Sequence, residues 1–491
     1  MRKERVSTGI EGLDEVLAGG LLQHQNALLR GPPGAGKTIF GLHFLGKGTE
    51  MGETSLFINL GEPSEYVRST AEAFGLQPDE IHFYDLSPTQ EQFAEEEAYS
   101  LFDASEVEQP AYIENLTEIV EDIEPDRVLL DPITEFRYLT TDDRQFRKQI
   151  LGFLDLLKTN DATVILTSQA SETIPDDDLQ FLTDTVISLE TSPDVRSVRV
   201  PKFRGSGARS GAHAYEISDG GVSVFPKIRA DESQETDVGF ETLSSGVPEL
   251  DQLLNGGLDE GTVTFLSGPT GVGKTTTGIQ FLKEAIAQGK TAVLYEFEES
   301  KRTLLNRADE VNIPIRNMFE QGSLSITEVQ PDAYSVDEFG HMVRSAVHTA
   351  DVDVILLDGI QGFKQNLRGL DENPQQDIMR IGRYLRSEGV TTLFTYEIHD
   401  ITGTFQVTEE GTSNLADTII FIRHVEYKGE LRKVIGTLKM RTSDFERSLR
   451  QLEITEHGLS VGDPLPHLRG ILSGTPNWND VSNETLSDNE S

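Results

Sequence analysis

Short apolar runs alternate with stretches of helical spacing along most of the chain. The runs 26–30 (NALLR) and 263–267 (VTFLS) each precede a glycine-rich loop, and 128–131 (VLLD) and 354–358 (VILLD) each end in aspartate. Short apolar strands that alternate with helices are typical of a parallel sheet with helices on both faces. The pattern therefore predicts an α/β fold built on mostly parallel sheet.

The last strand-like runs of each pattern follow one another without a helix between them. They are 185–190 and 197–203 in the first half of the chain, and 418–427 and 434–440 in the second. Neighbouring runs with a short connection favour antiparallel pairing. We expect them to form hairpins added to one edge of the sheet.

The chain repeats itself in register. STGIEGLDEVLAGGL at Ser7 recurs as SSGVPELDQLLNGGL at Ser244, and the same offset of 237 residues joins GPPGAGKT to GPTGVGKT. Asp131 matches Asp358 at an offset of 227, so the first copy holds ten extra residues, which we place in the acidic stretch 91–110. A duplication of this length predicts two tandem domains.

We expect the first domain at 1–230, a polar linker at 231–239 and the second domain at 240–465. A C-terminal tail follows at 466–491. Its end is polar and acidic, and we expect that end to be disordered.

The composition limits the partners. Among 491 residues, 42 Lys and Arg stand against 83 Asp and Glu, which gives a net charge of −41. Such a charge repels nucleic acid and anionic lipid, and no apolar run is long enough to cross a membrane. Cysteine is absent, which excludes disulfides and thiolate chemistry. We expect a soluble cytoplasmic protein that binds neither membrane nor nucleic acid.

The acidity itself has two interpretations. Only 15 of the basic residues are lysine, and the carboxylates are spread along the whole chain. This favours a surface adapted to a cytoplasm at high salt, where screening removes self-repulsion. An acidic interaction surface is the alternative.

Two GxxxxGKT loops are the strongest chemical signal. The backbone N–H groups of such a loop turn inward around a phosphate chain, and the following helix adds its N-terminal dipole. Lys37 and Lys274 are expected to reach the β- and γ-phosphates of ATP, and Thr38 and Thr275 to hold Mg²⁺. The expected nucleotide-binding residues are Gly31, Gly34, Ala35, Gly36, Lys37 and Thr38 in the first copy, and Gly268, Gly271, Val272, Gly273, Lys274 and Thr275 in the second.

Asp131 and Asp358 end apolar strands about 90–100 residues after the loops. A second carboxylate that orients Mg²⁺ belongs at this position in a nucleoside-triphosphatase. An aspartate that only forms a turn is the alternative, which the presence of the loops disfavours.

The second copy carries the carboxylates Glu298 and Glu299 just after the strand that follows its loop-borne helix. A carboxylate there can orient the attacking water or hydroxyl and accept its proton. The first copy keeps Glu62 opposite Glu299 but has Gly61 opposite Glu298. We expect catalysis from the second-copy pair and a weaker case for Glu62, whereas a solvated acidic pair is the alternative.

Lys202 and Arg204 recur at the same offset as Lys439 and Arg441. Basic residues two apart on a strand point to one face. The repeat favours a γ-phosphate contact over a surface ion-pair network. Their distance from the loops in sequence suggests that they reach the nucleotide of a neighbouring subunit, as arginine fingers do.

At these residues the chain resembles the KaiC family of RecA-like ATPases over nearly its whole length. The resemblance is carried by the paired openings, both phosphate loops, FEES, Asp358, the block ADTIIFIRHVEYKGELRKVIGTLKMR and the closing GLSVGDPLPHLRGILSGTP. It implies two tandem RecA-like P-loop domains, each a mostly parallel sheet flanked by helices with an added β-hairpin edge. It also implies a homohexamer of two stacked rings with ATP between subunits and Lys-x-Arg acting in trans.

The resemblance further implies slow ATP hydrolysis in the first ring and autophosphorylation of an adjacent Ser-Thr pair in the second. That pair falls on Ser413 and Asn414, so the serine is kept and the threonine is lost. We expect one phosphate at Ser413 or Thr412, with an unmodified polar loop as the alternative. The matching first-domain positions, Gln180 and Phe181, offer no hydroxyl.

The predicted function is that of a KaiC-like regulatory protein that binds and hydrolyses ATP with Mg²⁺, with Ser/Thr autokinase activity in the second domain and protein signalling partners. A RecA-type DNA-dependent ATPase is one alternative, but it needs basic loops that the sequence lacks. The other alternative is a non-catalytic scaffold in which bound nucleotides only stabilise the ring. Gly61 favours this alternative for the first domain.

Overall fold

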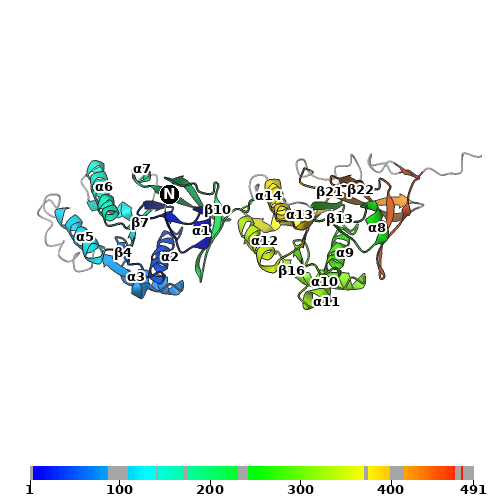
Figure 1. Cartoon of the computed structure of the whole chain (residues 1–491), viewed down its shortest axis with the longest axis horizontal. Coiled ribbons are helices and arrows are strands. Elements are labelled where there is room, and N and C mark those ends of the chain that lie inside the picture. Colours follow the sequence, from blue (N-terminus) through cyan, green and yellow to red (C-terminus); the bar gives the residue numbers. More distant parts are fainter. Residues whose placement is uncertain are drawn as a thin grey trace, which may run out of the picture. The chain divides into compact units, whose positions relative to one another are not determined.

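The computed structural model describes residues 4–86, 109–139, 142–169, 175–230, 241–369, 374–398, 414–427, 429–469 and 477–478. The chain forms two compact units, Met1–Lys227 and Ile228–Ser491 (Figure 1). The expected linker, most of the acidic stretch 91–110, the acceptor candidates Thr412 and Ser413, and the end of the tail lie outside the described residues.

The first unit begins with a short strand pair and continues into one large sheet with its helices. Its elements in chain order are β1 (Arg5–Val6), α1 (Glu11–Val16), β2 (Leu21–Leu22), β3 (Asn26–Arg30), α2 (Lys37–Glu50), β4 (Ser55–Asn59), α3 (Ser64–Ala73), η1 (Pro78–Glu80), β5 (His82–Asp85), α5 (Gln109–Ile123), β6 (Arg127–Asp131), η2 (Ile133–Leu139), α6 (Asp143–Thr159), β7 (Thr163–Ser168), α7 (Asp177–Leu182), β8 (Thr185–Thr191), β9 (Arg196–Phe203), β10 (His213–Ser218) and β11 (Gly221–Phe225).

The second unit repeats the order of the main-sheet strands and adds two further short strand pairs. Its elements are β12 (Thr242–Leu243), α8 (Pro248–Leu253), β13 (Leu258–Asp259), β14 (Val263–Gly268), α9 (Lys274–Ala287), β15 (Ala292–Glu296), α10 (Lys301–Glu310), α11 (Ile315–Glu320), β16 (Leu324–Glu328), β17 (Tyr334–Ser335), α12 (Val336–Ala350), β18 (Val354–Asp358), α13 (Ile360–Asn366), β19 (Leu367–Arg368), α14 (Pro374–Ser387), β20 (Thr391–Glu397), β21 (Thr418–Tyr427), β22 (Glu430–Met440), β23 (Arg450–Thr455), β24 (Gly458–Pro464), β25 (Leu468–Arg469) and β26 (Asn477–Trp478).

Each unit is built on a nine-stranded sheet. The strand order is β5-β4-β6-β7-β3-β8-β9-β10-β11 in the first unit and β16-β15-β18-β20-β14-β21-β22-β23-β24 in the second. The first six strands of each order run parallel, and the last three join antiparallel. The predicted parallel sheet with an added hairpin edge is confirmed.

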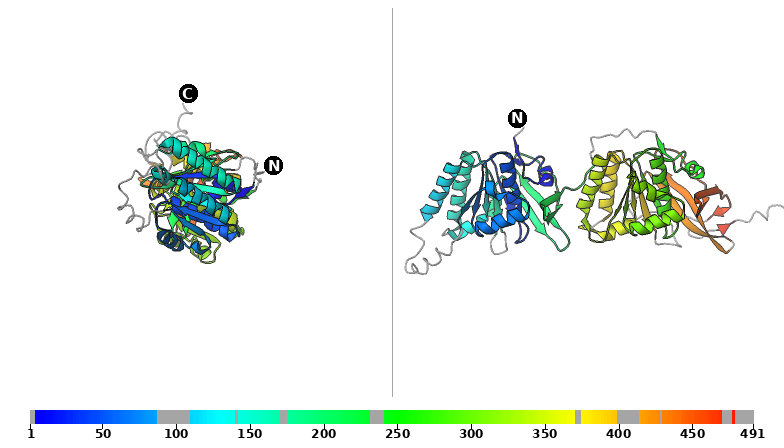
Figure 2. Two further views of the ribbon diagram at one scale, coloured as in Figure 1. Left: turned by 90° about the vertical axis from the view of Figure 1, so that its left-hand side faces the viewer. Right: turned by 90° about the horizontal axis from the view of Figure 1, so that it is seen from below.

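Helices cover both faces of each sheet (Figures 1 and 2). In the first unit α1, α2 and α3 pack on one face, and α5 and α6 on the other. In the second unit α8 to α11 take one face and α12 to α14 the other. The parallel strands are buried on both faces, which explains why they read as continuous apolar runs.

The repeated opening motif has a structural role. Asp14 accepts hydrogen bonds from the Ser7 hydroxyl at 2.5 Å and from the backbone and hydroxyl of Thr8 at 2.7 Å. Asp251 accepts the matching bond from Ser244 at 2.6 Å. The motif therefore ties the entry segment of each unit to its first helix.

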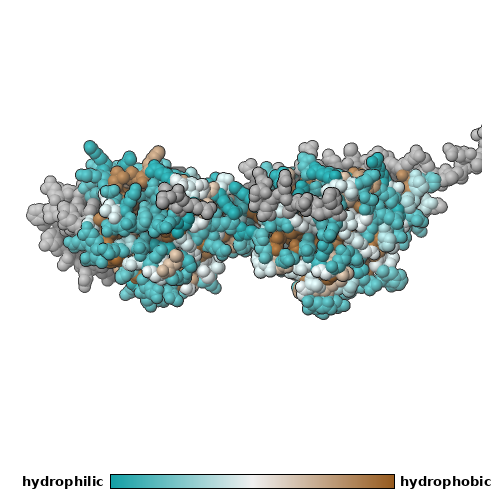
Figure 3. All heavy atoms as spheres, in the orientation of Figure 1, coloured by the Kyte–Doolittle hydropathy of each residue, from teal (hydrophilic) through white to brown (hydrophobic). Residues whose placement is uncertain are grey.

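Hydrophilic residues cover most of the face drawn in Figure 3. In the part of the chain that the structure describes, no helix is long and apolar enough to cross a membrane.

Candidate nucleotide sites

Each glycine-rich loop joins the central strand of its sheet to a helix. The loop after β3 leads into α2 at Lys37, and the loop after β14 leads into α9 at Lys274. Neither helix has a side-chain cap, so the first backbone N–H groups remain available for an anion. Four loop glycines take the left-handed conformation that the turn requires: Gly34, Gly36, Gly271 and Gly273.

The two loop lysines fold back over their own loops. Lys37 Nζ donates to the carbonyl oxygens of Gly31 and Pro32 at 2.9 and 3.0 Å. Lys274 Nζ makes the equivalent bonds in the second unit, also at 2.9 and 3.0 Å. Burial lowers the pKa of both lysines, and neighbouring carboxylates partly offset that effect. A triphosphate in the loop can replace the carbonyls as partner of each ammonium.

The threonine after Lys37 contacts the aspartate that ends a nearby strand. Thr38 Oγ1 donates to Asp131 Oδ2 at 2.6 Å. Thr275 and Asp358 hold the matching positions in α9 and β18, and Asp358 Oδ1 accepts from Thr395 at 2.6 Å. Hydroxyl and carboxylate oxygens suit Mg²⁺, so these residues fit the metal of a nucleotide complex.

The catalytic candidates Glu298 and Glu299 lie in the turn that follows β15. Partial desolvation raises the pKa of both carboxyls, and the charge of Asp358 raises it further. Arg307 Nη2 lies 2.5 Å from Glu299 Oε1 and opposes the shift there. A raised pKa makes a carboxylate a stronger proton acceptor, which suits a general base.

The first unit differs at this point by two coupled exchanges. Gly359 follows the β18 aspartate, and a Cβ there would lie 2.5 Å from Glu298 Cγ. The first unit has Pro132 in place of Gly359, and Gly61 in place of Glu298. A Cβ on Gly61 would lie 3.2 Å from Pro132 Cδ. The proline therefore fills the space that the glutamate uses in the second unit.

Glu62 is exposed, and its backbone carbonyl accepts a hydrogen bond from the Asn59 side chain. Sequence reasoning missed Glu397, which ends β20 in register with Gly268 and accepts from the Thr270 hydroxyl. A carboxylate at the end of the apolar run TLFTY was the available signal.

The basic pairs contact the segment that leads into β8 or β21. Lys202 Nζ donates to the carbonyl oxygens of Gln180 and Thr183, and Arg204 lies 3.4 Å from Phe181 O. In the second unit, Lys439 Nζ donates to Ala416 O at 2.6 Å. Arg441 Nη1 lies 3.9 Å from Asp417 Oδ1, so the members of each pair point the same way.

Strand register shows where the basic pairs lie relative to their own loops. β21 runs parallel to β14, with Thr418 beside Thr264 and Phe421 beside Ser267. Ala416, the Lys439 partner, precedes β21, whereas the phosphate loop follows β14. Each pair is therefore held at one end of the parallel strands, and the phosphate loop of its own unit lies at the other end.

Tandem parallel sheets with a lysine-bearing phosphate loop and a strand-end aspartate define a P-loop ATPase fold. The family model "ATPase: KaiC" matches residues 6–229 and again 243–465, and the chain belongs to the KaiC family of ATPases.

Similar proteins include two named circadian clock oscillator protein KaiC. The protein of Prochlorococcus marinus (strain MIT 9313) is 27% identical over 97% of this chain and 96% of its own length. That of Synechococcus elongatus (strain ATCC 33912 / PCC 7942 / FACHB-805) is 27% identical over 96% and 92%. Circadian clock protein KaiC3 of Synechocystis sp. (strain ATCC 27184 / PCC 6803 / Kazusa) is 25% identical over 96% and 94%.

Proposed function

We propose that both units bind Mg·ATP and that the second unit is the main site of phosphoryl transfer. The observation that carries this proposal is the carboxylate cluster of the second unit, where Glu298 and Glu299 join Asp358 beside a complete phosphate loop. The first unit keeps the loop and Asp131 but replaces Glu298 by glycine.

In each proposed site, loop N–H groups and the lysine ammonium bind the β- and γ-phosphates. Thr38 with Asp131, and Thr275 with Asp358, would hold Mg²⁺, which neutralises phosphate charge when bound. In the second unit, Glu298 or Glu299 accepts a proton from a water molecule while the oxygen of that water bonds to the γ-phosphorus. The bond from that phosphorus to the bridging oxygen breaks, and ADP leaves.

We further propose that the second unit is an autokinase. A serine hydroxyl can take the place of the water in the same in-line transfer. Ser413 and Thr412 are the candidate acceptors, with one phosphate per chain because Asn414 replaces a second acceptor. The support is family membership together with Lys439, which contacts Ala416 just after this segment.

We propose a homohexamer in which Lys202 with Arg204, and Lys439 with Arg441, reach the nucleotide of a neighbouring subunit. The support is the position of each pair, at the end of the parallel strands away from the phosphate loop of its own unit. A charge of −41 suits assembly at high salt, where screening lowers repulsion between subunits.

A nucleotide site that serves assembly alone is the second candidate for the first unit. The observation that favours it is Pro132, which fills the space of the missing glutamate. Bound ATP would then stabilise the ring by mass action without turnover.

The test is incubation of the full chain with Mg·ATP at high salt, followed by ADP release and intact mass. We expect ADP together with one added phosphate, mapped to 401–423. Lys274→Ala should remove most of both products, whereas Lys37→Ala should mainly weaken assembly in light scattering. Equal loss of turnover in the two variants would contradict the division of labour. Turnover without phosphate would leave an ATPase switch.

A further inference from the structure

A third carboxylate lies beside the catalytic candidates of the second unit. Glu296 ends β15 in register with Asp358, which ends β18. Carboxylate oxygens of Glu296, Glu299 and Asp358 all lie within 4.8 Å of one another. Glu296 and Asp358 are only 1% and 4% exposed. No role was predicted for Glu296.

The hydrogen bonds of Glu296 leave one of its oxygens unpaired. Its Oε1 accepts from the backbone N–H groups of Glu298 and Glu299, each at 3.0 Å. Its Oε2 is buried and has no hydrogen-bond partner among the described residues. Burial and the charge of Asp358 raise the pKa of this carboxyl to about 9. An unpaired carboxylate oxygen in such a place is costly unless a proton or a cation meets it.

The first unit has an amide side chain at the position that Glu296 holds in the second unit. Asn59 stands where the second unit has Glu296, and it is in register with Asp131 in the same way. Its Oδ1 accepts from Gly61 N at 3.2 Å, and its Nδ2 donates to Asp85 Oδ1 at 2.6 Å. An amide thus satisfies both a donor and an acceptor partner, whereas an ionised glutamate can only accept.

We propose that Glu296, Glu299 and Asp358 form a divalent-cation site that has no counterpart in the first unit. Three carboxylates favour a hard cation such as Mg²⁺ or Mn²⁺ over a soft one. Oxygens bound to one such ion lie at most about 4–5 Å apart, which the cluster can meet. The site shares Asp358 with the proposed nucleotide metal but needs no nucleotide to form.

The charges around the cluster favour a cation. Arg307 opposes a cation because it already pairs with Glu299 Oε1, but the other nearby positive group, Lys274, is held by carbonyls of its own loop. Glu298 and Glu397 add further negative charge nearby. The charges of both raise the pKa of Lys274, and the charge of Glu397 also raises the pKa of Glu298. A cation held by these residues would link β15 to β18 and fix the turn that carries Glu298.

The test is titration of the nucleotide-free full chain with Mn²⁺ at high salt, with free Mn²⁺ read by electron paramagnetic resonance. We expect about one tight site per chain, displaced by Mg²⁺. Glu296→Gln keeps the shape and should weaken that site at least about ten-fold. Glu296→Asn copies the first unit and should act alike. Glu328→Gln, which removes the same charge from the neighbouring strand end, should bind as the wild type does.

Equal Mn²⁺ binding by the wild type and Glu296→Gln would overturn the proposal and leave a proton as the occupant. An equal loss in Glu328→Gln would overturn it too, because net charge would then explain the binding. A second measurement locates the ion directly: Fe²⁺ with ascorbate and peroxide should cleave the folded chain near 296–299 and 358. Absence of those fragments would contradict the site. Neither assay uses ATP, so failure here leaves the ATPase proposal standing.

Discussion

At the scale of single residues, the two units differ by small exchanges that act in pairs. Glu298 occurs with Gly359, and Gly61 occurs with Pro132. Gly359 has a φ of 99° and gives Glu298 the space it occupies. Gly61→Glu alone would thus meet Pro132, and a gain of turnover in the first unit requires Pro132→Gly as well.

Gly359→Ala should displace Glu298. Its Cβ would lie 2.5 Å from Glu298 Cγ, so the carboxylate must move away from its position beside Asp358. We expect turnover to fall by about 10²-fold, the scale of a lost general base, with little change in nucleotide affinity. Steady-state ADP release and nucleotide titration measure the two quantities.

Gly289→Ala is the matched control for that variant. Gly289 has a φ of 86°, but a Cβ there would meet nothing within 4 Å. It carries the same kind of backbone strain without the clash. If both alanine variants slow ADP release equally, backbone strain explains the loss and the packing argument fails.

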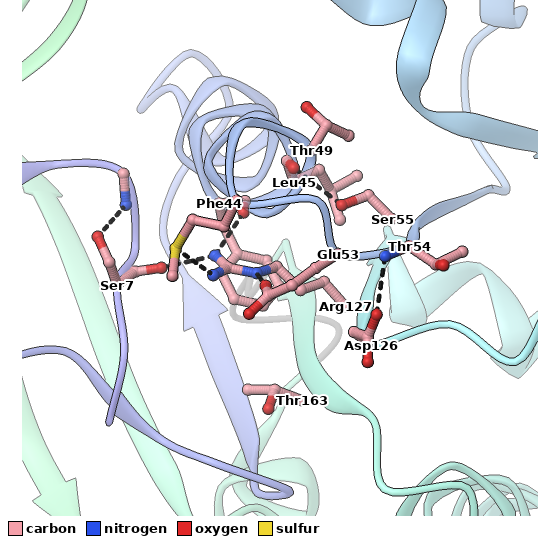
Figure 4. Close-up of polar contacts among 12 residues, drawn as sticks. Ser7, Phe44, Leu45, Thr49, Glu53, Thr54, Ser55, Asp126, Arg127 and Thr163 are labelled. Carbon is pink, nitrogen blue, oxygen red and sulfur yellow. Dashed lines mark hydrogen bonds and ion pairs between the residues drawn. The ribbon is translucent and has the colours of Figure 1, made fainter. Parts of the chain in front are cut away.

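At the scale of elements, a buried arginine links several elements of the first unit (Figure 4). Arg127 begins β6, is 1% exposed and pairs with Glu53. Its Nη1 donates to Ser7 O at 2.7 Å and to Phe44 O at 2.8 Å. One side chain thus joins the entry segment, α2 and the sheet. The second unit has Val354 at this position.

Arg127→Val should destabilise the first unit by about 3–5 kcal/mol, because it leaves Glu53 without its partner and two carbonyls without a donor. Calorimetry of the full chain should show one transition at lower temperature and the other unchanged. Glu53→Gln should cost less, since the amide can still accept a bond from the arginine. A shift of both transitions would contradict a role confined to the first unit.

The packing of α2 on the added hairpin gives a pH-dependent stability. His43 Nε2 accepts from Val222 N at 3.0 Å, and burial lowers the pKa of His43 below 6.5. The folded unit therefore binds that proton less tightly than the unfolded chain. The stabilisation from neutral His43 is present above pH 6.5. It is lost as the pH falls from there through the lower pKa that His43 has in the folded state.

His43→Gln tests this because it removes the titrating group while its amide oxygen can still accept a hydrogen bond from Val222 N. Glutamine is also the residue at the matching position of the second unit, Gln280, although its amide there donates to Ser245 O. We expect the wild-type first unit to lose more thermal stability than the variant between about pH 8 and about pH 5. Calorimetric midpoints across that range provide the measurement. Parallel pH profiles for the two proteins would refute a contribution from His43.

The elements were predictable where a local signal exists. Apolar runs, glycine loops and strand-end aspartates depend on residues close in sequence, and Lys37 and Asp131 were located in this way. Contacts made by strand register were not predictable. The neighbours of Glu296, the fit of Gly359 to Glu298 and the buried Arg127 each depend on which strand lies beside which, and no short pattern records that.

At the scale of the whole molecule, the proposed assembly follows from what one chain cannot do alone. Lys439 is tied to Ala416 at the start of β21, away from the loop after β14. Salt screening then matters as much as nucleotide, because subunits of charge −41 must approach one another. Light scattering should show rings with ATP at high salt, and a monomer under all conditions would refute the assembly.

Mixed rings provide the sharpest test of action in trans. Lys274→Ala removes the loop lysine but keeps the basic pair, and Arg441→Ala does the reverse. Each variant alone should be nearly inactive in the second unit. In a random equal mixture about a quarter of the interfaces join an intact loop to an intact pair, so about a quarter of wild-type turnover should return. If both residues instead act within one chain, mixing restores nothing, and subunit exchange followed by mass labelling shows that the rings did mix.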